Sequence, residues 1–242
     1  MENTIKCEDK ENYQKGEKKI DGKFFKNVSC PNFHRIYCKI KKFLCLIIKT
    51  KCIACEKNYG DFYGFCNDCF SKIIFINERF KDRFHIGRYE GPLKDAIIKY
   101  KYNGRKSYAK YFAKFIEKKI EEEKIEFDII IPVPLHWKKE FLRGFNQSAL
   151  IGNYLSKKIK KNMYQNVLLK SKNTKSQTEL GEQERKQNVK DSFKLKNSKI
   201  IKDKIILLID DVYTTGATTE ECKKILVKGG AKKVIILTIA KT

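Results

Sequence analysis

The chain has 242 residues, of which 41% are apolar and 34% are charged. The length allows one domain of ordinary size with an appendage, and the apolar fraction is high enough for a folded core, which speaks against a wholly disordered chain. The formal net charge of +24, from 53 Lys and Arg against 29 Asp and Glu, favours a polyanionic partner such as nucleic acid or a nucleotide.

The start of the chain predicts no folded domain. Residues 1–30 are polar and lysine-rich without periodicity, so we predict a disordered tail, followed by a short helix over Ile36–Ile48. The tail lacks the apolar core of a signal peptide, and the apolar stretch Phe43–Lys49 is too short to cross a bilayer. We therefore expect a cytoplasmic protein without a membrane span, whose nine cysteines stay reduced unless they hold metal.

Four cysteines form two knuckles, Cys52-x2-Cys55 and, ten residues later, Cys66-x2-Cys69. Two such knuckles can direct four thiolates to one tetrahedral centre, and Zn²⁺ suits this centre without redox chemistry. Because protein would fill all four positions, we expect a structural zinc site in a ribbon module over residues 31–76. Two redox-active CxxC pairs are the alternative.

Residues 77–242 show the pattern of an α/β domain. Segments with helical periodicity are separated by short apolar runs. These runs do not alternate between apolar and polar residues, which suits strands buried on both faces of a parallel sheet. The predicted helices are Pro92–Tyr102, Ser107–Glu123, Phe145–Lys160 and Thr218–Lys228, and the predicted strands are Ile129–Val133, Ile205–Ile209 and Val234–Ala240. The repeated order of strand and helix predicts a doubly wound sheet that binds ligands at the carboxyl ends of its strands.

Asp210 and Asp211 follow one of these strands and precede a loop rich in threonine and glycine. A helix begins in this loop, so its first N–H groups lack partners, and Gly216 lets an anion approach the backbone. A ribose phosphate suits both the loop and the acid pair, because its phosphate fits the loop and its hydroxyls can donate to the carboxylates. The carboxylates can also help to organise Mg²⁺ on a neighbouring pyrophosphate. The chain has no P-loop and no dinucleotide fingerprint. The alternative is a purely structural capped helix behind an acidic turn. It is disfavoured because two adjacent charges at the end of a buried strand are costly unless they bind something.

The stretch "IILLIDDVYTTGATTEECKKIL" resembles the signature of type I phosphoribosyltransferases, which bind phosphoribosyl pyrophosphate (PRPP). The resemblance implies that the two aspartates contact the ribose hydroxyls and that Thr214–Thr218 hold the phosphate. The expected PRPP-binding residues are Asp210, Asp211, Val212, Tyr213, Thr214, Thr215, Gly216, Ala217 and Thr218, together with Arg143 and Arg185.

The resemblance extends over about residues 40–242 to the ComF family, which carries an N-terminal four-cysteine zinc module. The segments Ile97–Arg105, Pro132–Gly152 and Thr174–Phe193 all look like ComF segments. ComF proteins are linked to DNA uptake in natural transformation and are similar to accessory partners of a DNA-translocating helicase. The resemblance supplies no phosphoribosyl acceptor.

Two arginines are candidates for binding pyrophosphate, and each has an alternative interpretation. By resemblance, the loop after Pro132 and Pro134 faces pyrophosphate, which Arg143 can hold bidentately; the alternative is an exposed arginine before a helix. Arg185 lies in the polar segment Ser171–Gln187, where related enzymes have a mobile lid, or it is a solvated charge.

Other residues are left open or assigned to structure. The basic residues Lys99, Lys101 and Arg105 can meet phosphate, DNA or solvent. Asn146 suits a helix N-cap, and Cys222 a core position.

Three functions remain open from the sequence. The first is a ComF-type protein that binds PRPP and single-stranded DNA in competence. The second is a metabolic phosphoribosyltransferase with an unidentified acceptor, in which Asp210 and Asp211 stabilise an oxocarbenium-like ribose while Mg²⁺ and Arg143 take up the charge on pyrophosphate. The third is a nucleic-acid-binding module with a regulatory or vestigial PRPP site. Only seven of the 53 basic residues are Arg, and excess Lys can also reflect an AT-rich genome, so charge alone does not decide.

Overall fold

The computed structural model describes residues 51–57, 60, 63–78, 81–171 and 191–242, which all belong to one compact unit. The predicted tail, the predicted helix Ile36–Ile48 and Arg185 lie outside the described residues. None of the helices in the described part combines the length and apolar character that a membrane crossing needs.

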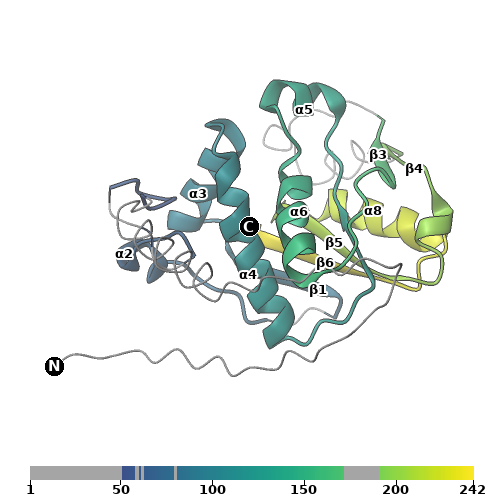
Figure 1. The fold of residues 1–242 in the computed structure, drawn as a ribbon, viewed down its shortest axis with the longest axis horizontal. Helices are drawn as coiled ribbons and strands as arrows, with labels where there is room; N and C mark the ends of the chain where they lie inside the picture. The colour runs from purple at the N-terminus through teal and green to yellow at the C-terminus, as the bar shows by residue number, and fades with distance from the viewer. Residues whose placement is uncertain (1–50, 58–59, 61–62, 79–80, 172–190) are drawn as a thin grey trace, which may run out of the picture. The chain divides into compact units, whose positions relative to one another are not determined.

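The centre of the unit is a parallel four-stranded sheet in the order β1-β6-β5-β2 (Figure 1). The strands are β1 (Arg83–Arg88), β2 (Ile129–Pro132), β5 (Ile205–Tyr213) and β6 (Lys233–Lys241). The three predicted strands are confirmed, and their apolar residues are buried because helices or loops cover both faces. β1 was not predicted, since this edge strand has charged residues at both ends and a short apolar centre.

β5 and β6 run further than the apolar runs predict. The two strands stay paired through Asp210↔Thr238 to Tyr213↔Lys241, so the acid pair lies inside β5 and does not follow it. β2 ends earlier: Pro132 pairs with Ile209, Val133 N–H still donates to the Ile209 carbonyl, and a second proline, Pro134, follows. The acids therefore lie in β5 where its β2 neighbour has just ended.

Helices cover both faces of the sheet, which confirms the doubly wound α/β fold. One core joins α3 (Gly91–Tyr102), α4 (Ala109–Glu122) and α6 (Gln147–Ile159) to Leu207 and Ile209 of β5. The other joins α8 (Ala217–Lys228) to Ile206 and Leu208. These alternate residues point to opposite faces, as the strand geometry requires. All four predicted helices are confirmed, and Cys222 is fully buried in the second core as predicted.

Several short elements were not predicted. They are α2 (Asn67–Phe70), the 3₁₀ turns η1 (Lys106–Tyr108) and η3 (Ser198–Ile200), α5 (Trp137–Arg143), and an antiparallel hairpin of β3 (Leu168–Lys170) and β4 (Phe193–Leu195). Each has seven residues or fewer, which is too short for a periodic signal.

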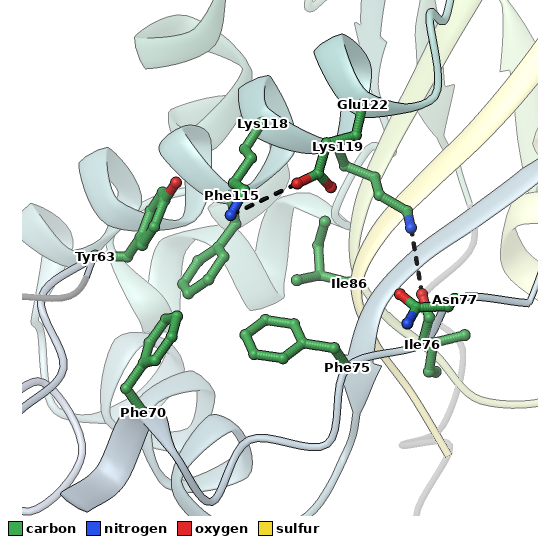
Figure 2. A pocket seen from close by; sticks show the side chains of 10 residues that line it. All are labelled: Tyr63, Phe70, Phe75, Ile76, Asn77, Ile86, Phe115, Lys118, Lys119 and Glu122. Carbon is green, nitrogen blue, oxygen red and sulfur yellow. Dashed lines mark hydrogen bonds and ion pairs between the residues drawn. The ribbon is translucent and has the colours of Figure 1, made fainter. Parts of the chain in front are cut away.

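The cysteine-bearing segment packs on the same core as α3 and α4. Figure 2 shows the contact, where the rings of Tyr63 and Phe115 stack with centroids 4.5 Å apart and Phe70 and Phe75 complete an aromatic cluster. The four rings line a cleft of about 300 Å³ whose lining includes no residue of β5 or α8. A division between a module ending at residue 76 and a domain starting at residue 77 stays a prediction.

Leu226→Ala should test the α8 core. Leu226 is fully buried, so its truncation should lower the free energy of unfolding by about 2–5 kcal/mol in urea denaturation. The matched control is its neighbour Val227, which is 48% exposed; Val227→Ala should change the free energy by about 0.5 kcal/mol or less. Equal effects of the two substitutions would contradict this packing.

Candidate functional site

Asp210 and Asp211 lie at the carboxyl end of the sheet, and both are buried. Because they are consecutive strand residues, their side chains leave β5 toward opposite faces. The Oδ1 atom of Asp210 accepts hydrogen bonds from Ser148 Oγ at 2.8 Å and from its neighbour's backbone N–H at 2.9 Å. Asp211 Oδ1 lies 2.9 Å from Lys101 Nζ of α3. The two acids therefore have separate partners.

The environment of Asp210 favours its neutral form. Burial, and next the charge on Asp211, raise the pKa of Asp210 to about 7, although its two hydrogen-bond donors act in the other direction. The carboxyl therefore binds a proton near neutral pH.

Lys101 keeps Asp211 paired. Burial alone would lower the pKa of Lys101, but the charge and hydrogen bond of Asp211 outweigh it, so the pKa is raised and the ammonium stays charged. Sequence reasoning left Lys101 open, because nothing in a lysine-rich segment marks which lysine faces an acid.

Two buried acceptor atoms at this edge have no hydrogen-bond partner among the described residues, Asp211 Oδ2 and Gln147 Oε1. Gln147 is the first residue of α6. Its backbone carbonyl accepts a hydrogen bond from Tyr100 Oη at 2.7 Å, so Gln147 contacts the residue that precedes Lys101 in α3. An unpaired buried acceptor costs about 1–3 kcal/mol, which a hydroxyl donor or a cation would recover. The carboxylate oxygen thus fits either a sugar hydroxyl or a hard cation.

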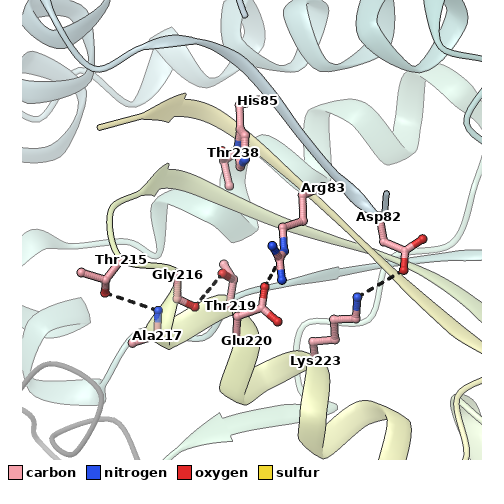
Figure 3. A network of polar contacts seen from close by, with 10 residues as sticks. All are labelled: Asp82, Arg83, His85, Thr215, Gly216, Ala217, Thr219, Glu220, Lys223 and Thr238. Atoms are coloured by element: carbon pink, nitrogen blue, oxygen red, sulfur yellow. Dashed lines mark hydrogen bonds and ion pairs between the residues drawn. The ribbon is translucent and has the colours of Figure 1, made fainter. Parts of the chain in front are cut away.

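The threonine–glycine loop turns directly into α8. Gly216 caps the helix with φ +76°, and a Cβ built on it would lie 2.1 Å from Tyr213 Oη, so a side chain there would be strained and would displace Tyr213. Thr215 Oγ1 accepts from Ala217 N at 3.5 Å, and Thr219 Oγ1 donates to the Gly216 carbonyl at 3.1 Å (Figure 3). The loop therefore leads to a helix N-terminus, which favours anions.

His85 supports this loop and was missed by sequence reasoning. Its Nδ1 lies 2.8 Å from Thr238 Oγ1, whose proton is donated to the Ala240 carbonyl, so Nδ1 is the donor. Burial, with smaller contributions from two nearby cations, lowers the pKa of His85 to about 4, which leaves the ring neutral. The ring lies 4.8 Å from that of Tyr213, which in turn contacts Gly216.

Two ion pairs tie α8 to the start of β1 (Figure 3). Arg83 Nε lies 2.7 Å from Glu220 Oε1, and Lys223 Nζ lies 3.4 Å from Asp82 Oδ2. Both pairs are partly exposed and so contribute modestly to stability. They hold the first two turns of α8, and with them the loop, against the sheet edge.

Arg143 ends α5 and does not lie in a loop, which corrects the prediction for this segment. Its guanidinium lies 5.2 Å over the ring of Tyr102 at the end of α3. Burial and then Asp211 raise the pKa of Tyr100, while Arg143 opposes this, so the arginine and the acid influence the same tyrosine. Asn146 caps α6 by accepting from Ala149 N at 3.1 Å, as predicted.

The structure brings the four predicted metal ligands together. The Sγ atoms of Cys52, Cys55, Cys66 and Cys69 all lie within 4.8 Å of one another, and those of Cys55 and Cys66 are 3.8 Å apart. A tetrahedron with metal–sulfur bonds of about 2.3 Å has edges of about 3.8 Å, so the four thiols fit a metal ion such as zinc.

Helix α3 connects the cysteine cluster to the acid site. Lys99 donates to the carbonyl of Ala54, between two cysteines, and its Nζ lies 3.4 Å from Glu56. Arg105 also pairs with Glu56, at 3.2 Å. The predicted basic patch therefore divides, with Lys99 and Arg105 turned to the knuckle and Lys101 to Asp211.

This chain is similar in sequence to several known proteins. Residues 146–242 match the phosphoribosyl transferase domain. The chain is 27% identical over 226 residues to Competence protein F of Haemophilus influenzae, covering 87% of this chain and 97% of that protein. It is 33% identical over 151 residues to Competence protein ComFC of Streptococcus pneumoniae, covering 60% and 62%. It is 32% identical over 115 residues to DNA utilization protein YhgH of Shigella flexneri, covering 48% of this chain and half of that protein.

The parallel sheet, the acid pair in β5 and the loop into α8 define a phosphoribosyltransferase-like domain of type I. The chain is thus similar to competence proteins of the ComF type, and its C-terminal part matches the phosphoribosyl transferase domain.

The proton on Asp210 predicts a pH-dependent stability. Between the ordinary pKa of 3.8 and the folded value of about 7, the folded chain holds a proton that the unfolded chain has released. The stabilisation of the folded chain by this proton is fully present below pH 3.8, and it is lost as the pH rises through the folded pKa of about 7. Urea denaturation of the ligand-free protein from about pH 5 to about pH 8 should show the wild type losing stability relative to Asp210→Asn, by up to about 1.4 kcal/mol per pH unit.

The exposed Asp95 of α3 provides the control for removing one carboxylate. Asp95→Asn should give a profile parallel to the wild type. A parallel profile for Asp210→Asn would show instead that Asp210 is ionised throughout.

Proposed function

We propose that the chain binds PRPP with Mg²⁺ at the acid pair and the Gly216 loop, and that it acts in DNA uptake during natural transformation. The observation that carries the ligand is the buried, unpaired Oδ2 of Asp211 beside Lys101. A ribose hydroxyl would satisfy this oxygen, while the helix N-terminus after Gly216 would take the phosphate. Arg185 would add a further cation to the bound pyrophosphate.

The two acids would contribute differently. Lys101 keeps Asp211 anchored, so Asp211 would accept from a ribose hydroxyl without moving. Asp210, which binds a proton near neutral pH, could donate to a sugar oxygen or accept from a hydroxyl after losing that proton. Arg143 would pair with the pyrophosphate from the end of α5.

Mg²⁺ prefers carboxylate and phosphate oxygens, so PRPP itself with the Asp210 and Asp211 carboxylates would hold the ion. When bound, Mg²⁺ supplies positive charge that neutralises the pyrophosphate. If the site turns over, the fixed negative charge of Asp211 would stabilise the positive charge that develops on the ribose ring.

The cysteine cluster would hold one structural Zn²⁺. Four thiolates fill all coordination positions and leave none for a substrate. Reduced thiols agree with a cytoplasmic protein. A zinc ion here would fix Ala54 and Glu56, and through Lys99 the position of α3.

A role in DNA uptake is supported by the names of the relatives, Competence protein F, Competence protein ComFC and DNA utilization protein, and by the net charge of +24. We extend this to binding of single-stranded DNA and to work beside a DNA-translocating helicase. The positive charge would supply salt-sensitive attraction to the DNA backbone.

Calorimetry with PRPP tests the site. The folded, zinc-loaded protein should bind PRPP in a Mg²⁺-dependent way, and Asp211→Asn should weaken binding on the order of 10-fold or more, since one hydrogen bond to a charged group is worth about 1.5–3 kcal/mol. Asp95→Asn is the control and should bind as the wild type. Absence of heat from the wild type would overturn the proposal.

Metal analysis tests the cysteine cluster. The purified chain should contain one zinc ion, and Cys66→Ser should lose it with a loss of stability, because three thiolates leave the tetrahedron incomplete. Cys222→Ser removes a cysteine from the other core and should keep its zinc. A metal-free wild type with two disulfides would favour redox-active CxxC pairs.

A further inference from the structure

Helix α5 exposes large apolar side chains at the edge of the unit. Trp137 is 64% exposed, Phe141 83% and Leu142 85%, and α5 has no buried residue. Tyr102 of α3, 70% exposed, lies beside the C-terminal end of α5, because Arg143 of α5 lies over its ring. Contiguous exposed apolar surface of this kind usually marks a binding site.

Cations accompany these rings. Lys138 Nζ lies 5.5 Å over the ring of Trp137, and the Arg143 guanidinium lies 5.2 Å over that of Tyr102. Lys106 approaches from η1, donating to the carbonyl of Gly144 at 3.1 Å. Within α5 itself, three residues are basic and one is acidic. The exposed rings thus lie in a positive field.

Aromatic faces interleaved with cations suit a single-stranded nucleic acid. Unpaired bases stack on exposed rings, while the backbone phosphates pair with the cations between them. A duplex keeps its bases stacked on one another and cannot use the rings in this way. Protein interfaces also use aromatic residues and arginine but are depleted in lysine, so the lysines favour nucleic acid over a protein partner.

We propose that Trp137, Phe141 and Tyr102, with Lys138, Lys106 and Arg143, form a stacking surface for single-stranded nucleic acid. This inference rests on the proposed role in DNA uptake and assigns that role a surface. The strand would pass beside the acid site, because α3 carries both Tyr102 and Lys101, which contacts Asp211.

The chain's one tryptophan makes this surface observable, since Trp137 lies in it. Titration of the full zinc-loaded chain with an oligothymidylate about 20 nucleotides long should quench the tryptophan fluorescence, with an affinity that falls steeply as salt rises. A duplex of the same length should bind more weakly and quench less.

Phe141→Ala should weaken oligothymidylate binding on the order of 10-fold, as loss of one stacked base does. Phe141 is so exposed that this variant should fold normally and keep its PRPP affinity. Ile74→Ala removes another exposed apolar side chain, 51% exposed, away from α5 and should bind oligothymidylate as the wild type.

The outcomes separate the surface from the function. A wild type that binds no oligothymidylate would overturn both the surface and DNA binding. Oligothymidylate binding without quenching, and with full affinity in Phe141→Ala, would overturn only the surface. A blue shift with anionic phospholipid vesicles, and no response to oligothymidylate, would assign α5 to a membrane surface and overturn the inference.

Discussion

Lys101 and Asp211 form a buried ion pair, 2.9 Å apart, between the end of α3 and the carboxyl end of β5. Removing two charges from water costs several kcal/mol each, and their attraction offsets this only if the geometry is good and the remaining polar atoms are satisfied. Here one carboxylate oxygen stays without a partner among the described residues. A further donor or cation would satisfy this oxygen, and the proposed ligand would supply one.

The same ion pair fixes the relation between distant parts of the chain. Three consecutive residues of α3 reach three different elements: Lys99 contacts the cysteine knuckle, Tyr100 contacts the start of α6, and Lys101 contacts β5. A shift of α3 would disturb all three contacts together. The cysteine cluster and the acid site thus both contact the same helix.

The sequence was sufficient for the central part of this arrangement. The short apolar run before Asp210 favours a buried strand, and the left-handed backbone at Gly216 favours glycine, so both follow from local chemistry. The partners could not be predicted, because Lys101 and Ser148 are brought to the acids by packing between segments far apart in the chain. β1 and α5 could not be predicted because they are too short to give a periodic signal. Arg185 lies outside the described residues.

The most direct test of the central claim compares two sugars that differ by one hydroxyl. Calorimetry should show that ribose 5-phosphate binds tighter than 2-deoxyribose 5-phosphate by on the order of 10-fold or more, because a buried carboxylate would lose its donor. Asp211→Asn should largely remove the difference. Equal affinities of the wild type for the two sugars would contradict the account, since they would mean that the buried acids do not contact the ribose.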